Sequence, residues 1–253
     1  MTRTRKVLAW IGGILLLLVV VLVVILATFD WNRIKPTINT KVSDILHRPF
    51  AINGNLAVRW QREADEGGWR AWVPWPHVIA EDLSLGNPEW SKEPQMVGLK
   101  KVELRLSPLA LLTQTVDIPR IDLTEPSASL ERLADGRANW TFKFDPKDPN
   151  EKPSDWKVDI GAIGFDKGHV TLNDQTLKTR LDVVIDPLGK PIPFSDIVGQ
   201  SAAKKALEKG SAPQDYAFAL KVKGQYHGQN LDGTGKIGGL LALQDAAKPF
   251  PLQ

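Results

Sequence analysis

The sequence predicts a mainly β protein, in which an antiparallel sheet of hairpins follows a single N-terminal transmembrane helix. Three observations predict this fold class. A long apolar run lies near the N-terminus, apolar and polar residues alternate from Phe50 onward, and helices do not punctuate the strands as they do in a parallel βαβ sheet. Such alternation gives a sheet with one apolar face and one wetted face, and we expect only a few short helices beside it.

The N-terminal run from Val7 to Ala27 has no charged side chain. About 20 apolar residues in a helix cross the hydrocarbon core of a bilayer, and only a helix satisfies its own backbone there. A cleaved signal peptide is the alternative, but its apolar core is usually about 7–15 residues long, which is shorter than this run. We therefore expect a cytoplasmic tail at residues 1–6 and an uncleaved anchor at residues 7–29.

The charges of the chain indicate its orientation and exclude one class of partner. Arg3, Arg5 and Lys6 precede the apolar run, and positive residues stay on the cytoplasmic side of a membrane. The chain has 32 Lys+Arg and 29 Asp+Glu, so the remainder is neutral once those three basic residues are set aside. A nucleic-acid partner needs clustered positive charge, and we therefore expect none. The absence of cysteine excludes disulfides and thiolate sites.

Residues 30–49 are predicted to form an amphipathic helix at the end of the sheet. Its apolar side chains recur at helical spacing, at Ile34, Ile38, Val42, Ile45 and Leu46. Pro36 either lies in the first turn of this helix or kinks a continuous helix. The helix could lie on the membrane surface or pack as a plug against the sheet. Its polar face is not rich in Lys or Arg, which favours the plug.

Residues 50–253 are predicted to form one β domain, with a possible internal boundary in the Pro- and charge-rich link at 145–155. Short helices are expected at 108–113 and 195–209, and Asn53-Gly54 indicates a turn or bulge. The last residues, 250–253, resemble the opening of another strand, so we expect the native protein to be longer. The predicted strands are 50–58, 77–85, 97–106, 116–123, 128–133, 140–144, 158–160, 170–172, 181–185 and 218–222.

The loop between the first two strands contains Trp69, Trp72 and Trp75. These rings could enter the headgroup layer of a membrane, where tryptophan is enriched. They could equally pack on the edge of the sheet. The sequence alone does not favour either interpretation.

The motifs that could carry chemistry lack the context that such chemistry needs. The histidines are isolated, so no metal site is expected. Ser201 to Lys204 matches S-x-x-K without its companion motifs. Gly233 to Gly238 matches G-x-G-x-x-G without the following helix and acid. Asn139-Trp140-Thr141 has the form of a glycosylation sequon, but it is interpreted as a strand after a turn. We expect no enzyme activity and no cofactor.

Five segments, in this order and spacing, resemble the bacterial AsmA family. They are Phe29-Asp30-Trp31-Asn32-Arg33-Ile34-Lys35-Pro36, Phe50-Ala51-Ile52-Asn53-Gly54-Asn55-Leu56, Leu83-Ser84-Leu85-Gly86-Asn87-Pro88-Glu89-Trp90, Leu106-Ser107-Pro108-Leu109 and Asp135-Gly136-Arg137-Ala138-Asn139-Trp140. One departure is His47-Arg48-Pro49, where many members have a Gly-Arg pair. The resemblance implies a single-pass protein of the Gram-negative inner membrane that projects into the periplasm. It also implies a curled sheet with an apolar groove, linked to phospholipid movement toward the outer membrane and to envelope integrity, and it brings no catalytic residues.

The rows of alternating apolar residues in the predicted strands supply candidates for the side chains that would face lipid in such a groove. A sandwich core, packed sheet on sheet, is the alternative use of the same rows. A second function is also open, in which the protein is a scaffold or assembly factor that binds outer-membrane proteins at its sheet edges. The candidate lipid-facing residues are Val102, Leu104, Leu106, Trp140, Phe142, Phe144, Leu181, Val183, Ile185, Phe218, Leu220 and Val222.

Overall fold

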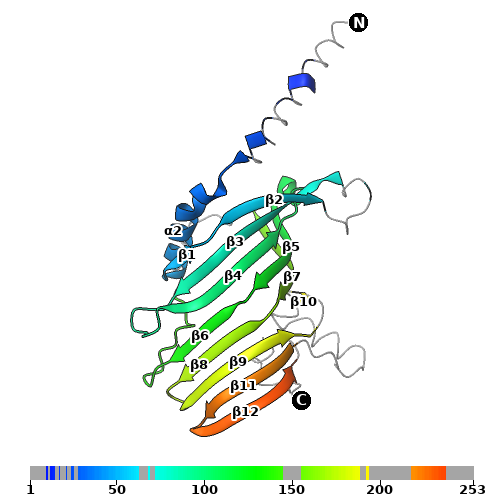
Figure 1. Ribbon diagram of the computed structural model, residues 1–253. Helices are drawn as coiled ribbons and strands as arrows, with labels where there is room; N and C mark the ends of the chain where they lie inside the picture. The colour runs from blue at the N-terminus through cyan, green and yellow to red at the C-terminus, as the bar shows by residue number, and fades with distance from the viewer. Residues whose placement is uncertain are drawn as a thin grey trace.

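A single 12-stranded sheet forms the body of the protein in this computed structural model (Figure 1). The structure describes residues 28–62, 72–144, 155–188, 192–193 and 218–237, together with Gly68 and scattered positions between 10 and 25. The strand order is β10-β7-β5-β4-β6-β8-β9-β11-β12, and β3 joins the other edge of β4 and carries β1 and β2. The sheet is open and curled, and its helices are few and short, which confirms the mainly β prediction.

The strands agree with most of the predicted ranges. In chain order they are β1 (Phe50–Ile52), β2 (Leu56–Arg62), β3 (Pro74–Gly86), β4 (Gln95–Arg105), β5 (Thr115–Thr124), β6 (Ser127–Arg132), β7 (Lys157–Phe165), β8 (Gly168–Asp174), β9 (Thr179–Pro187), β10 (Ile192–Pro193), β11 (Phe218–Tyr226) and β12 (Gln229–Ile237). A short 3₁₀ helix, η3 (Ala110–Thr113), lies between β4 and β5, within the helical turn predicted there.

Two ladders are parallel, which departs from the predicted series of antiparallel hairpins. β5 and β6 follow one another along β4, and β7 and β8 follow one another beside them in the parallel sense. The chain therefore leaves β6 at one end of the sheet and enters β7 at the other end, beside the start of β5. No crossover helix is present among the described residues of that connection, so the usual sequence signal of a parallel pair is missing.

The apolar positions of β3 and β4, and those of the successive strands β5–β6 and β7–β8, change phase along one line across the sheet. Asp82 (φ 51°) and Glu125 (φ 47°) adopt the left-handed backbone region on this line, and Glu81 and Asp82 are both exposed. Such a break reverses which alternate residues of a strand point to a given face, as a β-bulge does. Apolar side chains that step by an odd number across the break therefore stay on one face. We call this line the crease and define it by Asp82, Lys100, Glu125 and Asp166. The apolar side chains step by three or five residues across it, from Ala80 to Leu83, Leu99 to Val102, Leu123 to Ala128 and Phe165 to Val170.

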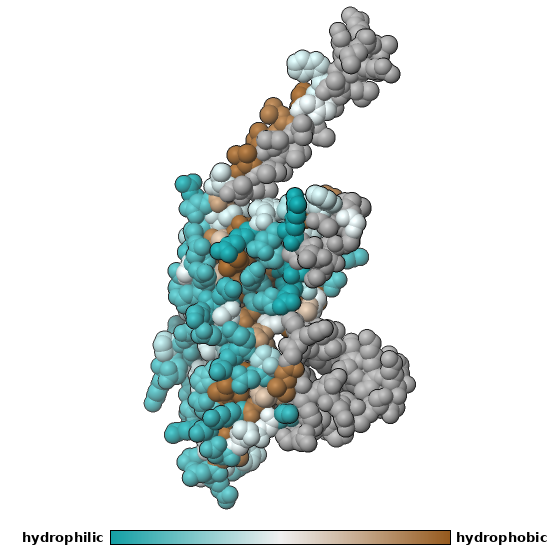
Figure 2. Space-filling view, turned by 45° about the vertical axis from the view of Figure 1, so that its right-hand side comes forward, coloured by the Kyte–Doolittle hydropathy of each residue, from teal (hydrophilic) through white to brown (hydrophobic). Residues whose placement is uncertain are grey.

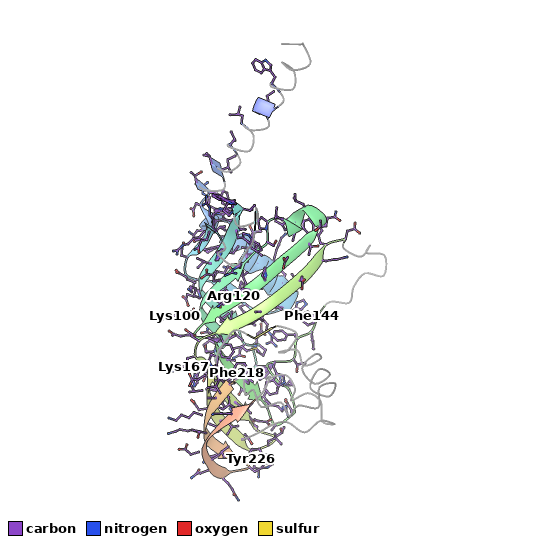
Figure 3. All side chains as sticks on the ribbon, turned by 90° about the vertical axis from the view of Figure 1, so that its right-hand side faces the viewer. Lys100, Arg120, Phe144, Lys167, Phe218 and Tyr226 are labelled. Carbon is purple, nitrogen blue, oxygen red and sulfur yellow. The ribbon has the colours of Figure 1, made fainter. Side chains whose placement is uncertain are left out.

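Polar contacts hold the crease together. Lys100 Nζ donates to Glu125 Oε1 at 2.7 Å, and the Glu125 backbone N–H donates to Asp166 Oδ1 at 2.6 Å. The hydrogen bond with Glu125, and then the charge of Glu125, raise the pKa of Lys100. Figure 3 shows the curled sheet from the side, with Lys100 and Lys167 on one side of it and Phe144 on the other.

The predicted helix at 30–49 is present as η1 (Trp31–Ile34) followed by α2 (Lys35–Leu46). Pro36 lies in the first turn of α2, so it begins this helix and does not kink a longer one. Ile34 and Ile38 pack on a cluster of Ile52, Leu56 and Ala80. This helix therefore packs against the sheet, in the position that the plug interpretation describes.

Asn53-Gly54 interrupts one edge strand and does not form a hairpin turn. β1 and β2, on either side of it, both pair with β3. A Cβ at Gly54 would lie 2.7 Å from the carbonyl oxygen of Glu81, so the close approach of the two backbones requires glycine. The bulge interpretation of this pair is the correct one.

Several predictions fall on residues that the structure describes only in part. Within its described residues, no helix combines the length and the apolar character that crossing a membrane needs. The predicted anchor, residues 7–29, lies largely outside the described residues and is not supported by this finding. Residues 145–154 of the possible boundary, the predicted helix at 195–209 and residues 250–253 are outside them as well.

Candidate functional site

Apolar side chains share one face of the sheet from β3 to β7. Residues paired across neighbouring strands lie on the same face, so the strand registers identify this surface. The partners on one row are Val78, Leu104, Ile121 and Ile163, and the partners on the next row are Ala80, Val102, Leu123 and Phe165.

The same face continues across the crease into the second half of the sheet. The Phe165 ring stacks on the Phe218 ring, with centroids 5.3 Å apart and an interplanar angle of 14°. Val170 and Ile185 pack in the same cluster. We call the whole surface the apolar face and define it by the two rows above together with Ala128, Leu130, Val170, Leu172, Leu181, Val183, Ile185, Phe218, Leu220 and Val222.

Most of the candidate lipid-facing residues lie together on this apolar face. Ile185 and Phe218 are fully buried, with exposed fractions of 8% and 1%. The others are half-buried, so they keep part of their apolar surface accessible. Leu106 follows the end of β4 and is also half-buried. The candidates that the registers place on the apolar face are Val102, Leu104, Leu181, Val183, Ile185, Phe218, Leu220 and Val222.

The strand predicted at 140–144 is wrong, although its aromatic residues alternate. Trp140 lies in a turn, and the chain from Thr141 to Phe144 has no regular secondary structure. The Phe142 and Phe144 rings stack on each other, and the Arg48 guanidinium lies 5.6 Å from the centroid of the Phe142 ring. The Phe144 side chain is 64% exposed. A role of these three aromatic residues toward lipid stays a prediction.

A buried asparagine explains why this segment is not a strand. Asn139 is completely buried, and its Oδ1 accepts from the Glu131 backbone N–H at 2.9 Å. Its Nδ2 donates to the Ser129 carbonyl and to Asn87 Oδ1, both at 2.7 Å. One amide side chain thus satisfies part of the edge of β6 and ties two loops together. Because the Asn139 side-chain amide is buried and hydrogen-bonded within the protein, we assign a structural role to this residue of the sequon.

The opposite face of the sheet is charged. Glu103 lies between Val102 and Leu104 in β4, and its carboxylate is 2.9 Å from His77 Nδ1. Asp182 lies between Leu181 and Val183 in β9, and its carboxylate is 3.0 Å from His169 Nε2. Figure 2 shows apolar side chains gathered along the body of the molecule beside a largely hydrophilic surface. The predicted wetted face is therefore present at His169 and Asp182 in the second half of the sheet, whereas along β3 the same face is buried at Trp75, His77 and Ile79.

The described residues offer no arrangement for metal or nucleotide chemistry. They contain no group of His, Cys, Asp and Glu side chains that could hold a metal ion. Gly233 and Gly235 of the G-x-G-x-x-G match lie in β12, opposite Val222 and Leu220, so the motif is part of a hairpin. The S-x-x-K match at 201–204 is outside the described part of the chain.

The tryptophans of the loop before β3 do not all behave alike, so neither the membrane interpretation nor the sheet-packing interpretation describes the whole loop. Trp75 is 3% exposed at the start of β3, whereas Trp72 is 72% exposed and lies under the Arg62 guanidinium, 5.2 Å from its ring centroid. Trp69 is outside the described residues. One ring therefore packs on the sheet and another remains available at its surface.

Comparisons with known proteins agree with the resemblance seen in the motifs. A sequence model of the AsmA family matches residues 1–253. The Escherichia coli (strain K12) protein described as AsmA family protein YhjG is 52% identical over 256 residues, which is 100% of this chain and 37% of that protein. This chain therefore spans well under half the length of that relative. No solved structure matches the chain.

Proposed function

Because this chain belongs to the AsmA family, we propose that it is a single-pass inner-membrane protein whose periplasmic sheet shelters phospholipid acyl chains on their way toward the outer membrane. Membership of the family indicates a function in the cell envelope. In this proposal residues 7–29 are the anchor, residues 1–6 are cytoplasmic and the sheet is periplasmic. The chain is 37% of the length of its relative, so transport across the envelope would need the rest of the protein.

The continuous apolar face is the observation that supports this proposal best. Each acyl methylene that leaves water for an apolar surface gains about 0.8 kcal/mol. Rows in cross-strand register, such as Val183 beside Val222, present similar side chains from one strand to the next. An acyl chain could therefore move along the face without a large change in free energy, while its headgroup stays in water.

This function needs no chemical step. The lipid would be held by burial of its apolar surface, which is non-directional and roughly proportional to area. We accordingly propose that the protein is not an enzyme and uses no cofactor. Phospholipid and the inner membrane are its proposed partners, and nucleic acid is not one of them.

A second candidate function follows from the last strand. Among the described residues, β12 pairs only with β11, so its other edge presents backbone donors and acceptors. A scaffold for outer-membrane proteins could bind an extended segment there by strand addition. The same edge could also continue into the remainder of a longer chain.

Photo-crosslinking distinguishes the two functions. A photo-reactive amino acid at Leu104 or Val183 would lie on the apolar face, and the matched controls Glu103 and Asp182 are their immediate neighbours on the charged face. We expect phospholipid adducts at Leu104 and Val183 and few at the controls. Equal capture at all four positions would overturn the lipid proposal. Protein adducts from a reporter at Asn230 in β12, without lipid at Leu104, would favour the scaffold.

A further inference from the structure

One end of the sheet carries a group of large apolar side chains that face solvent. Leu112 is 82% exposed and Trp72 is 72% exposed, although side chains of this size are usually covered. We call this group the proximal rim. Its residues and their exposed fractions are Trp60 39%, Trp72 72%, Leu111 44%, Leu112 82%, Trp156 49% and Val158 66%.

The sheet topology brings these residues to the same edge although they are far apart in the sequence. Arg62, at the end of β2, pairs with Pro74, at the start of β3. The Leu106 backbone N–H, just after β4, donates to the Pro76 carbonyl at 3.0 Å. The Lys157 backbone N–H, at the start of β7, donates to the Gln114 carbonyl just after η3 at 3.0 Å. The ends of β2 and β4 and the starts of β3, β5 and β7 therefore form one rim.

This rim lies at the end of the molecule from which the chain runs to its N-terminus. Figures 1 and 3 show the described N-terminal residues above the sheet, with η3 and the starts of β5 and β7 at its upper end. The N-terminal segment and the sheet are in direct contact near this rim. The side chain of Asn32 in η1 accepts from the backbone N–H of Leu56, the first residue of β2, at 2.9 Å. Trp60 is only about 13 Å further along β2, at roughly 3.3 Å per residue.

We propose that the proximal rim inserts into the headgroup layer of the same membrane that anchors the chain. This inference rests on the proposed function for the anchor, residues 7–29, and adds a second contact to it. Tryptophan is enriched at the level of the headgroups, where its apolar ring and its N–H group are both satisfied. The two adjacent leucines of η3 extend beyond the strand ends and would reach the acyl boundary.

The rim suits a lipid surface better than a protein groove. Its side chains come from separate strand ends and turns, and they project outward. Arg62 and Lys157 lie among them and can contact lipid phosphates, as basic residues at interfaces do. A second contact would also restrict the tilt of the sheet and hold the start of the apolar face at the bilayer, where lipid could enter it.

A single fluorescent reporter tests this proposal, since the chain has no cysteine and an introduced one is unique. The full chain would be prepared as Leu112→Cys, as Leu177→Cys and as Leu17→Cys, each labelled with an environment-sensitive dye. Leu177 is 40% exposed in the turn between β8 and β9 and is the control from another edge of the sheet. Leu17 reports on the anchor. The proteins would be placed in nanodiscs of phosphatidylethanolamine and phosphatidylglycerol containing a lipid that quenches at headgroup depth.

We expect several-fold stronger quenching at Leu112 than at Leu177, together with quenching at Leu17. Quenching at Leu17 with equal, weak quenching at Leu112 and Leu177 would overturn the rim contact and leave the anchor proposal standing. Absence of quenching at all three positions would overturn both proposals. A photo-crosslinker at Leu112 that captures protein and no lipid would show that the rim binds a protein, which also contradicts the inference.

Discussion

The apolar face is closed in two different ways at two clusters, and each cluster includes residues from both sides of the crease. Near β1, the helices η1 and α2 pack over the cluster of Ile52, Leu56 and Ala80. At the second cluster, Phe218 of β11 is buried against Phe165 of the same sheet, so the curl itself closes the face. The first cluster uses a separate element as a cover, and the second uses the shape of the strands.

This difference explains how an open sheet can be stable while part of its apolar face stays available. Complete coverage would make the sheet a layer of an ordinary core, with no surface left for a guest. On this face the fully buried positions are concentrated in two clusters, and side chains such as Leu104 and Leu181 remain half-buried. Substitutions in and between the clusters can test this division, and the largest effect is expected in the curl.

Phe218→Ala should be the most damaging single substitution of the set. It removes a ring that is 1% exposed and stacked on Phe165, and such changes cost about 3–5 kcal/mol. The free energy of unfolding would be measured by chemical denaturation. Phe218→Leu, which keeps much of the volume, is the control and should lose less. A loss below about 1 kcal/mol for Phe218→Ala would show that the curl does not bury a core.

Leu56→Ala and Leu181→Ala compare the helix-covered cluster with the surface between the clusters. Leu56 is 4% exposed, so its truncation should cost about 2–5 kcal/mol. Leu181 is half-buried, and its truncation should cost roughly 1 kcal/mol, because it loses less buried area. The same denaturation measurement gives both values. Equal losses would mean that Leu181 belongs to a closed core, which contradicts the available apolar face.

Asn139→Ala tests the buried hydrogen bonds that join β6 to the neighbouring loops. The substitution leaves the Glu131 N–H, the Ser129 carbonyl and Asn87 without their buried partner. We expect a loss of about 2–3 kcal/mol, since buried groups without hydrogen bonds are costly. Thr141→Ala, an exposed neighbour, is the control in the same thermal denaturation. If both variants melt together with the parent, Asn139 does not tie the two loops.

Asp174, at the end of β8, should make a smaller contribution to stability, and this contribution should depend on pH. Burial alone would raise the pKa of Asp174, but hydrogen bonds from Thr176 and Leu177 and the charge of Arg132 hold that pKa below its ordinary value. Its folded-state pKa is thus lower than that of the unfolded chain. The ionised carboxylate therefore adds stability above the unfolded value of about 3.9, and this stability is lost as the pH falls through the folded value.

Asp174→Asn should lower the free energy of unfolding by about 1–2 kcal/mol at neutral pH. The difference from the parent should shrink as the pH falls below about 3.9. Denaturation curves collected across the acid range measure both expectations. A difference that grows toward low pH would contradict the assigned direction of the pKa shift.

Alternation in the sequence was enough to predict much of the apolar face. The rows around Val183 and Val222 were expected to share a surface, and the register pairs these two residues directly. The phase break at the crease was also readable, because the apolar step of three from Leu99 to Val102 breaks the period of two. Its meaning becomes clear only when the same break is seen in neighbouring strands.

The remaining errors come from interactions that a local pattern does not contain. The parallel pairing of β5 with β7 joins segments far apart in the sequence, and no crossover helix signals it among the described residues. Aromatic alternation at Trp140 and Phe142 resembles a strand, but the buried Asn139 side chain takes the edge of β6 instead. The rim was missed for the same reason, since only the topology brings Leu112 and Trp156 together.

Native mass spectrometry of the detergent-extracted chain tests the central claim most directly. The parent chain would be compared with Leu104→Asn/Val183→Asn, which makes two half-buried positions of the apolar face polar, and with Glu103→Gln/Asp182→Asn, the matched change on the charged face. We predict phospholipid adducts on the parent and on the charged-face variant, and their loss from the apolar-face variant. Folded parent chains without bound phospholipid, or adducts that persist equally in all three proteins, would contradict the claim that this face holds acyl chains.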